Sequence, residues 1–82
     1  MNTNGAMREI VNRAGISQRA ASERMGRSPN WLGATLARQG SSEAVTLASL
    51  ASACGYALVL VPKDAVDGSM LVIDPPSRED DQ

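Results

Sequence analysis

The chain has 82 residues with one cysteine and no histidine, which excludes an internal disulfide and leaves zinc without its usual ligands. No nucleophile–base arrangement is recognisable, so we expect one small domain that is not an enzyme and needs neither metal nor cofactor. Residues 1–40 carry six arginines against two glutamates, a net charge of +4, whereas residues 41–82 carry two basic against seven acidic side chains, a net charge of −5. This asymmetry is typical of a nucleic-acid-binding half joined to an acidic half or tail, with ordinary solvated surface as the alternative.

Residues 5–14 are predicted to form the first helix, because their apolar side chains recur at helical spacing. Thr3 or Asn4 would cap its start, and Gly15 stands where a left-handed residue commonly ends a helix. The apolar stripe consists of Met7, Ile10, Val11 and Ala14.

Residues 18–25 and 29–38 are predicted to form two short helices joined by a tight turn. Ser17 is a good N-cap for the first of them, and Gly26 ends it. Ser28 would cap the second, with Pro29 at its first position, where a proline costs no hydrogen bond. Two helices in this arrangement are typical of a helix-turn-helix, whose second helix enters the major groove of DNA.

A fourth helix is predicted between the loop of residues 40–45 and Gly55. Thr46 would cap this helix, and Val45 and Leu50 would pack together as a hydrophobic staple across its first turn. Its apolar stripe includes Cys54, which we expect to be a small buried side chain and not a reactive thiol.

Residues 57–76 are predicted to form a β-hairpin, because two runs rich in β-branched residues, 57–61 and 70–73, flank a turn-forming segment. Neither run alternates apolar with polar residues, so both faces of the hairpin would be apolar. A lone hairpin is marginal in water, so we expect two copies of the chain to associate through it as a homodimer. A hairpin wrapped entirely onto its own helices is the alternative. The predicted dimerisation residues are Leu58, Val59, Leu60, Val61, Met70, Leu71, Val72 and Ile73.

The stretch from Ser17 to Gly40, followed by residues 46–56, resembles the lambda-repressor-like (Cro/repressor, XRE-type) helix-turn-helix family. The resemblance covers about residues 5–56 and implies a mainly α fold of four to five helices, with residues 1–56 as the DNA-binding domain. The added hairpin is similar to that of dimeric antitoxin-type repressors, and the acidic residues 77–82 would form a disordered tail. The chain departs from the family at Ala21 and Ser22, where Leu and Ala are usual, and at Thr35, where an aliphatic residue is more common.

The resemblance and the helix positions together predict a surface that binds double-stranded DNA. Gln18, at the start of its helix, would contact phosphate, and Asn30 would pair with adenine or bond locally near the helix cap. Trp31 would either fill space beside Ala21 or donate its indole N–H to a phosphate, while Gly33 indicates a close approach of DNA or of Trp31. The predicted DNA-binding residues are Gln18, Arg19, Arg27, Ser28, Asn30, Trp31, Ala34, Thr35, Arg38 and Gln39.

The expected function is therefore sequence-specific transcriptional regulation, by a repressor that binds a palindromic operator as a homodimer. An antitoxin that regulates its own gene and binds a toxin through its C-terminal part is one alternative, and a protein-interaction module with a degenerate helix-turn-helix is another. No run resembles a signal peptide and none is long enough to span a membrane, so we expect a cytoplasmic protein with no membrane partner.

Overall fold

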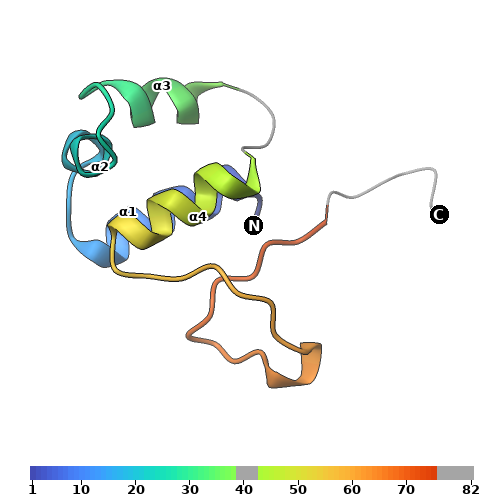
Figure 1. Cartoon of the computed structure of the whole chain (residues 1–82). Helices are drawn as coiled ribbons and strands as arrows, with labels where there is room; N and C mark the ends of the chain where they lie inside the picture. Colours follow the sequence, from blue (N-terminus) through green and yellow to red (C-terminus); the bar gives the residue numbers. More distant parts are fainter. Residues whose placement is uncertain (39–42, 76–82) are drawn as a thin grey trace.

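The structure, a computed structural model, describes residues 1–38 and 43–75 (Figure 1). These ranges contain the helices α1 (Thr3–Ala14), α2 (Gln18–Arg24), α3 (Trp31–Ala37) and α4 (Ala44–Ala53), and the short 3-10 turn η1 (Lys63–Ala65). Since no strand occurs in them, the expected mainly helical fold is confirmed. No helix in the described ranges is long and apolar enough to cross a bilayer.

The core lies where the four helices meet. α1 packs against α4, and α2 packs against both α3 and α4. Its largest fully buried apolar side chains are Met7 of α1, Leu32 of α3, and Leu47 and Leu50 of α4. Full burial of a side chain of this size contributes about 1.5–3 kcal/mol to the free energy of folding, so this cluster holds the helices together. Cys54 is also buried in the core, as predicted.

Three of the helices end at glycines, as their sequence predicts. Gly26, which follows α2, has a φ of 71°, in the left-handed region that only glycine adopts without strain. There its N–H donates to the carbonyl of Glu23, and the N–H of Arg27 donates to the carbonyl of Ser22, the pair of bonds that defines a Schellman motif. Gly15 after α1 and Gly55 after α4 close their helices in the same way.

The helix starts agree less well with the sequence prediction. Ser17 does cap α2, since its hydroxyl accepts a hydrogen bond from the N–H of Ala20 at 3.0 Å. α1 is capped by Asn2, whose side chain accepts from the N–H of Gly5 at 2.8 Å, and not by Thr3 or Asn4.

The start of α4 also differs from the prediction. α4 begins at Ala44, with Glu43 as its N-cap residue. Thr46, which was predicted to cap this helix, therefore lies within its first turn. Val45 is 74 % exposed, and the expected staple between Val45 and Leu50 is therefore absent. Leu47 and Leu50 are buried in the core all the same.

The predicted start of α3 at Pro29, with Ser28 as its cap, is wrong. Residues 28–31 form a β-turn closed by a hydrogen bond from the N–H of Trp31 to the carbonyl of Ser28 at 3.0 Å. Pro29 occupies the second position of this turn, which suits its fixed φ, and Asn30 follows with φ −95° and ψ 1°, as in a type I turn. α3 therefore begins at Trp31, with Asn30 as its N-cap.

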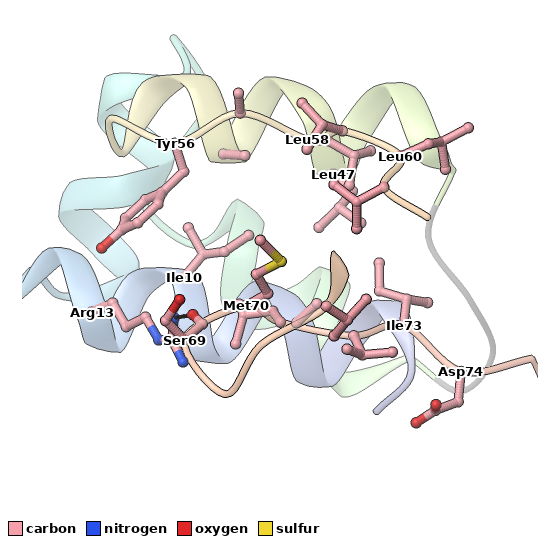
Figure 2. Close-up of a pocket in the computed structure, with 18 of the residues that line it drawn as sticks. Ile10, Arg13, Leu47, Tyr56, Leu58, Leu60, Ser69, Met70, Ile73 and Asp74 are labelled. Carbon is pink, nitrogen blue, oxygen red and sulfur yellow. Dashed lines mark hydrogen bonds between the residues drawn. The ribbon is translucent and has the colours of Figure 1, made fainter. Parts of the chain in front are cut away.

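Residues 57–75, here called the C-terminal arm, do not form the predicted hairpin. No strand occurs in them, and no backbone hydrogen bond joins residues 57–61 to residues 70–73. The turn-forming segment folds instead into η1 and an Asx turn, in which the Asp67 carboxylate accepts from the N–H of Ser69 at 2.8 Å. Hydrogen bonds from Ser69 lower the pKa of Asp67. The two apolar runs thus separate, with Leu58 and Leu60 on one side of an open space and Met70 and Ile73 on the other (Figure 2), and Leu71 packs against the helical core.

The returning part of the arm is tied to α1 by polar contacts. Arg13 donates to the carbonyl of Ser69 at 2.6 Å. Near the start of α1, the amino group of Met1 lies 2.6 Å from the carboxylate of Asp74, and the Asp74 N–H donates to the Met1 carbonyl at 2.9 Å. These contacts fix residues 69–74 alongside α1.

Candidate nucleic-acid interface

α3 presents one side to the core and leaves the opposite side uncovered. Leu32 and Leu36 are both buried and hold the helix against α2 and the rest of the core. Helical geometry places Asn30, Ala34 and Ala37 opposite them, and all three are exposed. We call the exposed surface formed by residues 30, 33, 34 and 37 the outer face of α3. It lies away from the C-terminal arm, on the far side of α1 and α4 (Figure 1).

The outer face of α3 consists of small residues, and Gly33, which has no side chain, is the clearest example. A methyl group added at Gly33 would meet only the side-chain oxygen of Gln18, at an ordinary contact distance of 3.6 Å. Trp31 does not pack across Gly33, so that predicted explanation for the glycine is wrong. No contact within the described chain requires a glycine at this position.

Gln18 and Arg19, at the start of α2, are both exposed. The Gln18 side chain reaches the outer face of α3, as its distance from Gly33 shows. Arg19 lies 3.8 Å from Glu23, and both side chains are largely exposed, so this ion pair holds the arginine only weakly. The structure therefore brings the Gln18 side chain close to Gly33 of α3, and leaves Arg19 exposed beside it in the chain.

Arg27 and Trp31 form a stacked pair at the start of α3. The Arg27 guanidinium lies 5.2 Å from the centre of the Trp31 ring, a cation–π contact that contributes about 0.5–1 kcal/mol at an exposed site. Trp31 is half-buried and packs against the core. Trp31 thus contributes to the core, while Arg27 remains exposed.

Ser28 and Asn30 are both exposed, and Asn30, although it is the N-cap residue of α3, makes no side-chain capping hydrogen bond. The turn at residues 28–31 takes the place of a side-chain cap. The alternative prediction for Asn30, a local hydrogen bond near the helix cap, is therefore wrong.

The end of α3 carries Thr35 and Arg38. Thr35 is half-buried, and its hydroxyl accepts a hydrogen bond from the exposed Arg38 at 3.2 Å. Within residues 1–38 and 43–75, neither Arg27 nor Arg38 lies within 4 Å of a carboxylate. Two exposed positive charges thus flank the outer face of α3, one at each end. The remaining predicted contact, Gln39, lies outside the described residues.

Four residues of this region were not among the predicted site residues: Asn4, Arg8, Ser22 and Ala37. Ala37 could have been found by its spacing of seven residues from Asn30 on one helical face. Arg8 looked like an ordinary surface charge, but it donates to the carbonyl of Leu36 at 3.3 Å. Ser22 was noted only as a departure from the family pattern, and no local signal gave its contact with α3.

The C-terminal arm forms a second surface, which is apolar. Of the eleven large apolar side chains exposed in the described residues, nine lie in residues 56–73. The arm and the α1–α4 pair enclose an open groove of about 670 Å³, with Tyr56, Leu58 and Leu60 on one side and Met70 and Ile73 on the other (Figure 2). All eight predicted dimerisation residues line it, and Leu71 is the one that is half-buried.

Comparisons with protein-family models, curated proteins and solved structures found no match to this chain. The functional argument therefore rests on the geometry of the outer face of α3 and of the arm.

Proposed function

We propose that the chain is a transcriptional repressor that binds double-stranded DNA and reads its sequence with α3. The observation that carries this proposal is the outer face of α3, which is uncovered, built from small side chains and flanked by Arg27 and Arg38. A recognition helix lies in the major groove and reads base edges with its outward side chains, and short side chains let the helix lie deeper in the groove. The resemblance to lambda-repressor-like helix-turn-helix proteins supports the same assignment.

The residues divide into two groups by the part of the duplex that they would contact. Gln18 at the start of α2, with the exposed guanidinium groups of Arg19, Arg27 and Arg38, would bind phosphates and set the register of the protein on the duplex. Asn30 would pair with adenine N6 and N7, and Ala34 would contact a thymine methyl group. With so few base contacts, DNA shape would supply part of the specificity.

We propose further that two copies associate through the C-terminal arm. Nine of the eleven large apolar side chains exposed in the described residues lie in residues 56–73, many of them beside an apolar groove, and clustered exposed apolar side chains often mark a protein–protein interaction surface. A second copy supplies a matching apolar arm, and its association would be two-fold symmetric. Two copies of α3 would then meet half-sites about 34 Å apart in a palindromic operator.

The decisive experiment is the selection of bound sequences from a pool of random DNA duplexes. A two-fold symmetric motif is expected, and binding to it should weaken steeply with salt because phosphate contacts release counterions. In the same assay Asn30→Ala should cost about 1–3 kcal/mol and relax specificity at one position, while Arg27→Ala should weaken binding to all sequences and lower the salt slope by about 1.

Arg24→Ala is the matched control for the charge, because Arg24 is an exposed arginine of α2 that acts on Cys54 and is not among the proposed DNA contacts. It should change affinity less than Arg27→Ala. Unchanged affinity in both Asn30→Ala and Arg27→Ala would contradict the assigned surface. Failure of the wild-type chain to retain any duplex at low salt would contradict DNA binding itself and favour a protein partner, such as a toxin, at the groove of the arm.

A further inference from the structure

α3 is a short helix with a narrow attachment to the core. It has seven residues, of which Leu32 and Leu36 are buried and Trp31 packs half-buried against the core. Leu32 and Leu36 lie one above the other, since they are four residues apart. Apolar contacts of this kind hold the helix against the core but have little directional preference. Directional polar contacts to the backbone at the two ends of α3 add a constraint on its rotation about its own axis.

At the start of α3 the constraint comes from Ser22 of α2, whose side chain is fully buried. Its hydroxyl accepts from the N–H of Leu32 at 3.0 Å and donates to the carbonyl of Gln18 at 2.9 Å. The N–H of Leu32 is among the first amides of the helix, which have no partner within it. Because Asn30 provides no side-chain cap, Ser22 serves this amide from a neighbouring helix.

At the end of α3 the constraint comes from α1. The Arg8 guanidinium donates to the carbonyl of Leu36 at 3.3 Å, and the side-chain amide of Asn4 donates to the carbonyl of Arg38 at 3.3 Å. Carbonyls at a helix C-terminus carry partial negative charge, so a cation there is stabilising. Asn4 is buried, which makes its contact part of the packing between α1 and the end of α3.

We infer that Ser22 and Arg8 are positioning residues for DNA recognition, because their contacts with the backbone of α3 fix the rotation of that helix. They thereby orient Asn30 and Ala34 toward the bases without contacting DNA themselves. This inference rests on the proposed function and deepens it. It predicts that two affinities respond differently to substitution. Affinity for the selected operator depends on the orientation of α3, whereas affinity for an unrelated duplex depends on phosphate contacts.

The test measures binding of Ser22→Ala, Arg8→Ala and Arg8→Lys to the selected operator and to an unrelated duplex of equal length, at several salt concentrations. Ser22→Ala and Arg8→Ala should each lower operator affinity about tenfold or more, change affinity for the unrelated duplex less than twofold, and keep the salt slope within about 0.3. Arg8→Lys keeps a cationic donor and should restore most of the operator affinity.

Ala48→Gly is the control for stability, because it weakens α4 and leaves the contacts of α3 intact. An equal loss of operator specificity in Ala48→Gly, at a matched loss of thermal stability, would show that Ser22 and Arg8 act through stability alone and would overturn the inference. An unchanged ratio of operator to unrelated-duplex affinity in Arg8→Ala would also overturn the inference. If Ser22→Ala does not fold, Arg8→Ala alone decides the test. If the wild-type chain binds no duplex, the proposed function fails first, and the inference fails with it.

Discussion

Gly33 lies in the middle of α3, where a glycine costs a helix about 1 kcal/mol relative to alanine. The protein around it gives no reason for that cost, because an added methyl group would make only an ordinary contact with Gln18. The proposed reason is the close approach of a duplex to the outer face of α3.

Replacing Gly33 by alanine separates stability from binding. Gly33→Ala should raise the free energy of unfolding by about 1 kcal/mol, measured by urea denaturation, and should weaken operator binding through the added methyl group. Asn12→Ala, at an exposed position of α1, should also stabilise the protein but leave operator affinity unchanged. Tighter operator binding by Gly33→Ala would show that DNA does not approach α3 at this residue.

Cys54 provides a second test at the scale of one side chain. Burial raises the pKa of its thiol, and the nearby positive charge of Arg24 opposes this to a smaller degree. We expect Cys54 to react with a disulfide reagent at pH 8 at least tenfold more slowly in the native chain than in urea, because little thiolate forms and access is closed.

The same shift in pKa predicts how stability varies with pH. Since the folded thiol ionises at higher pH than the unfolded thiol, its contribution is fully present below about pH 8.5 and is lost as the pH rises through the folded pKa. Cys54→Ala should remove this part of the alkaline decline in unfolding free energy. Identical pH profiles for the two chains would contradict a raised pKa.

At the scale of the elements, the sequence predicted helix ends better than helix starts. A glycine after an apolar stripe has few alternatives, and Gly15, Gly26 and Gly55 each end a helix as expected. Capping residues compete with their neighbours: Asn2, Thr3 and Asn4 follow one another, and the structure selects the first of them. Pro29 fits the first turn of a helix and the second position of a β-turn equally well, and local sequence does not choose between them.

The selection of Asn2 as the cap of α1 is directly testable. Asn2→Ala should lower the free energy of unfolding by about 1 kcal/mol, because the N–H of Gly5 loses its acceptor. Ser17→Ala should cost about as much as Asn2→Ala, because Ser17 caps α2 in the same way. An unchanged free energy of unfolding in Asn2→Ala, measured by urea denaturation, would contradict this assignment of the cap.

The candidate site was predicted from sequence where it depends on one helix, and missed where it depends on contacts between helices. Asn30 and Ala34 follow from their spacing within α3, and both are on its outer face. The roles of Ser22 and Arg8 require the relative placement of three helices, which no short-range pattern encodes. The predicted hairpin was wrong because residues 57–61 and 70–73 have the composition of strands but do not pair, and Leu71 packs against the helical core instead.

At the scale of the whole molecule, α3 and the C-terminal arm lie on opposite sides of the α1–α4 pair (Figure 1), and the arm lines the apolar groove. A dimer formed through the arms would therefore leave both copies of α3 uncovered. Association and DNA reading would then be affected by different substitutions.

Leu60, whose side chain is fully exposed at 101 %, is the residue at which to test the association. Leu60→Asp should abolish the dimer, measured by sedimentation at micromolar concentration, because it places a charge in the apolar interface. Val45→Asp adds the same charge at an exposed position of α4 outside the arm and should leave the dimer intact. A wild-type chain that sediments as a monomer would refute association through the arm, and a dimer that survives Leu60→Asp would place its interface elsewhere.

The separation of the two surfaces also bears on how such a protein diversifies. After gene duplication, one copy could acquire new side chains on α3 and a new operator while its arm still pairs with that of its parent. Mixed dimers would then recognise hybrid sites made of one ancestral and one altered half, so that a single duplication would yield three operator specificities.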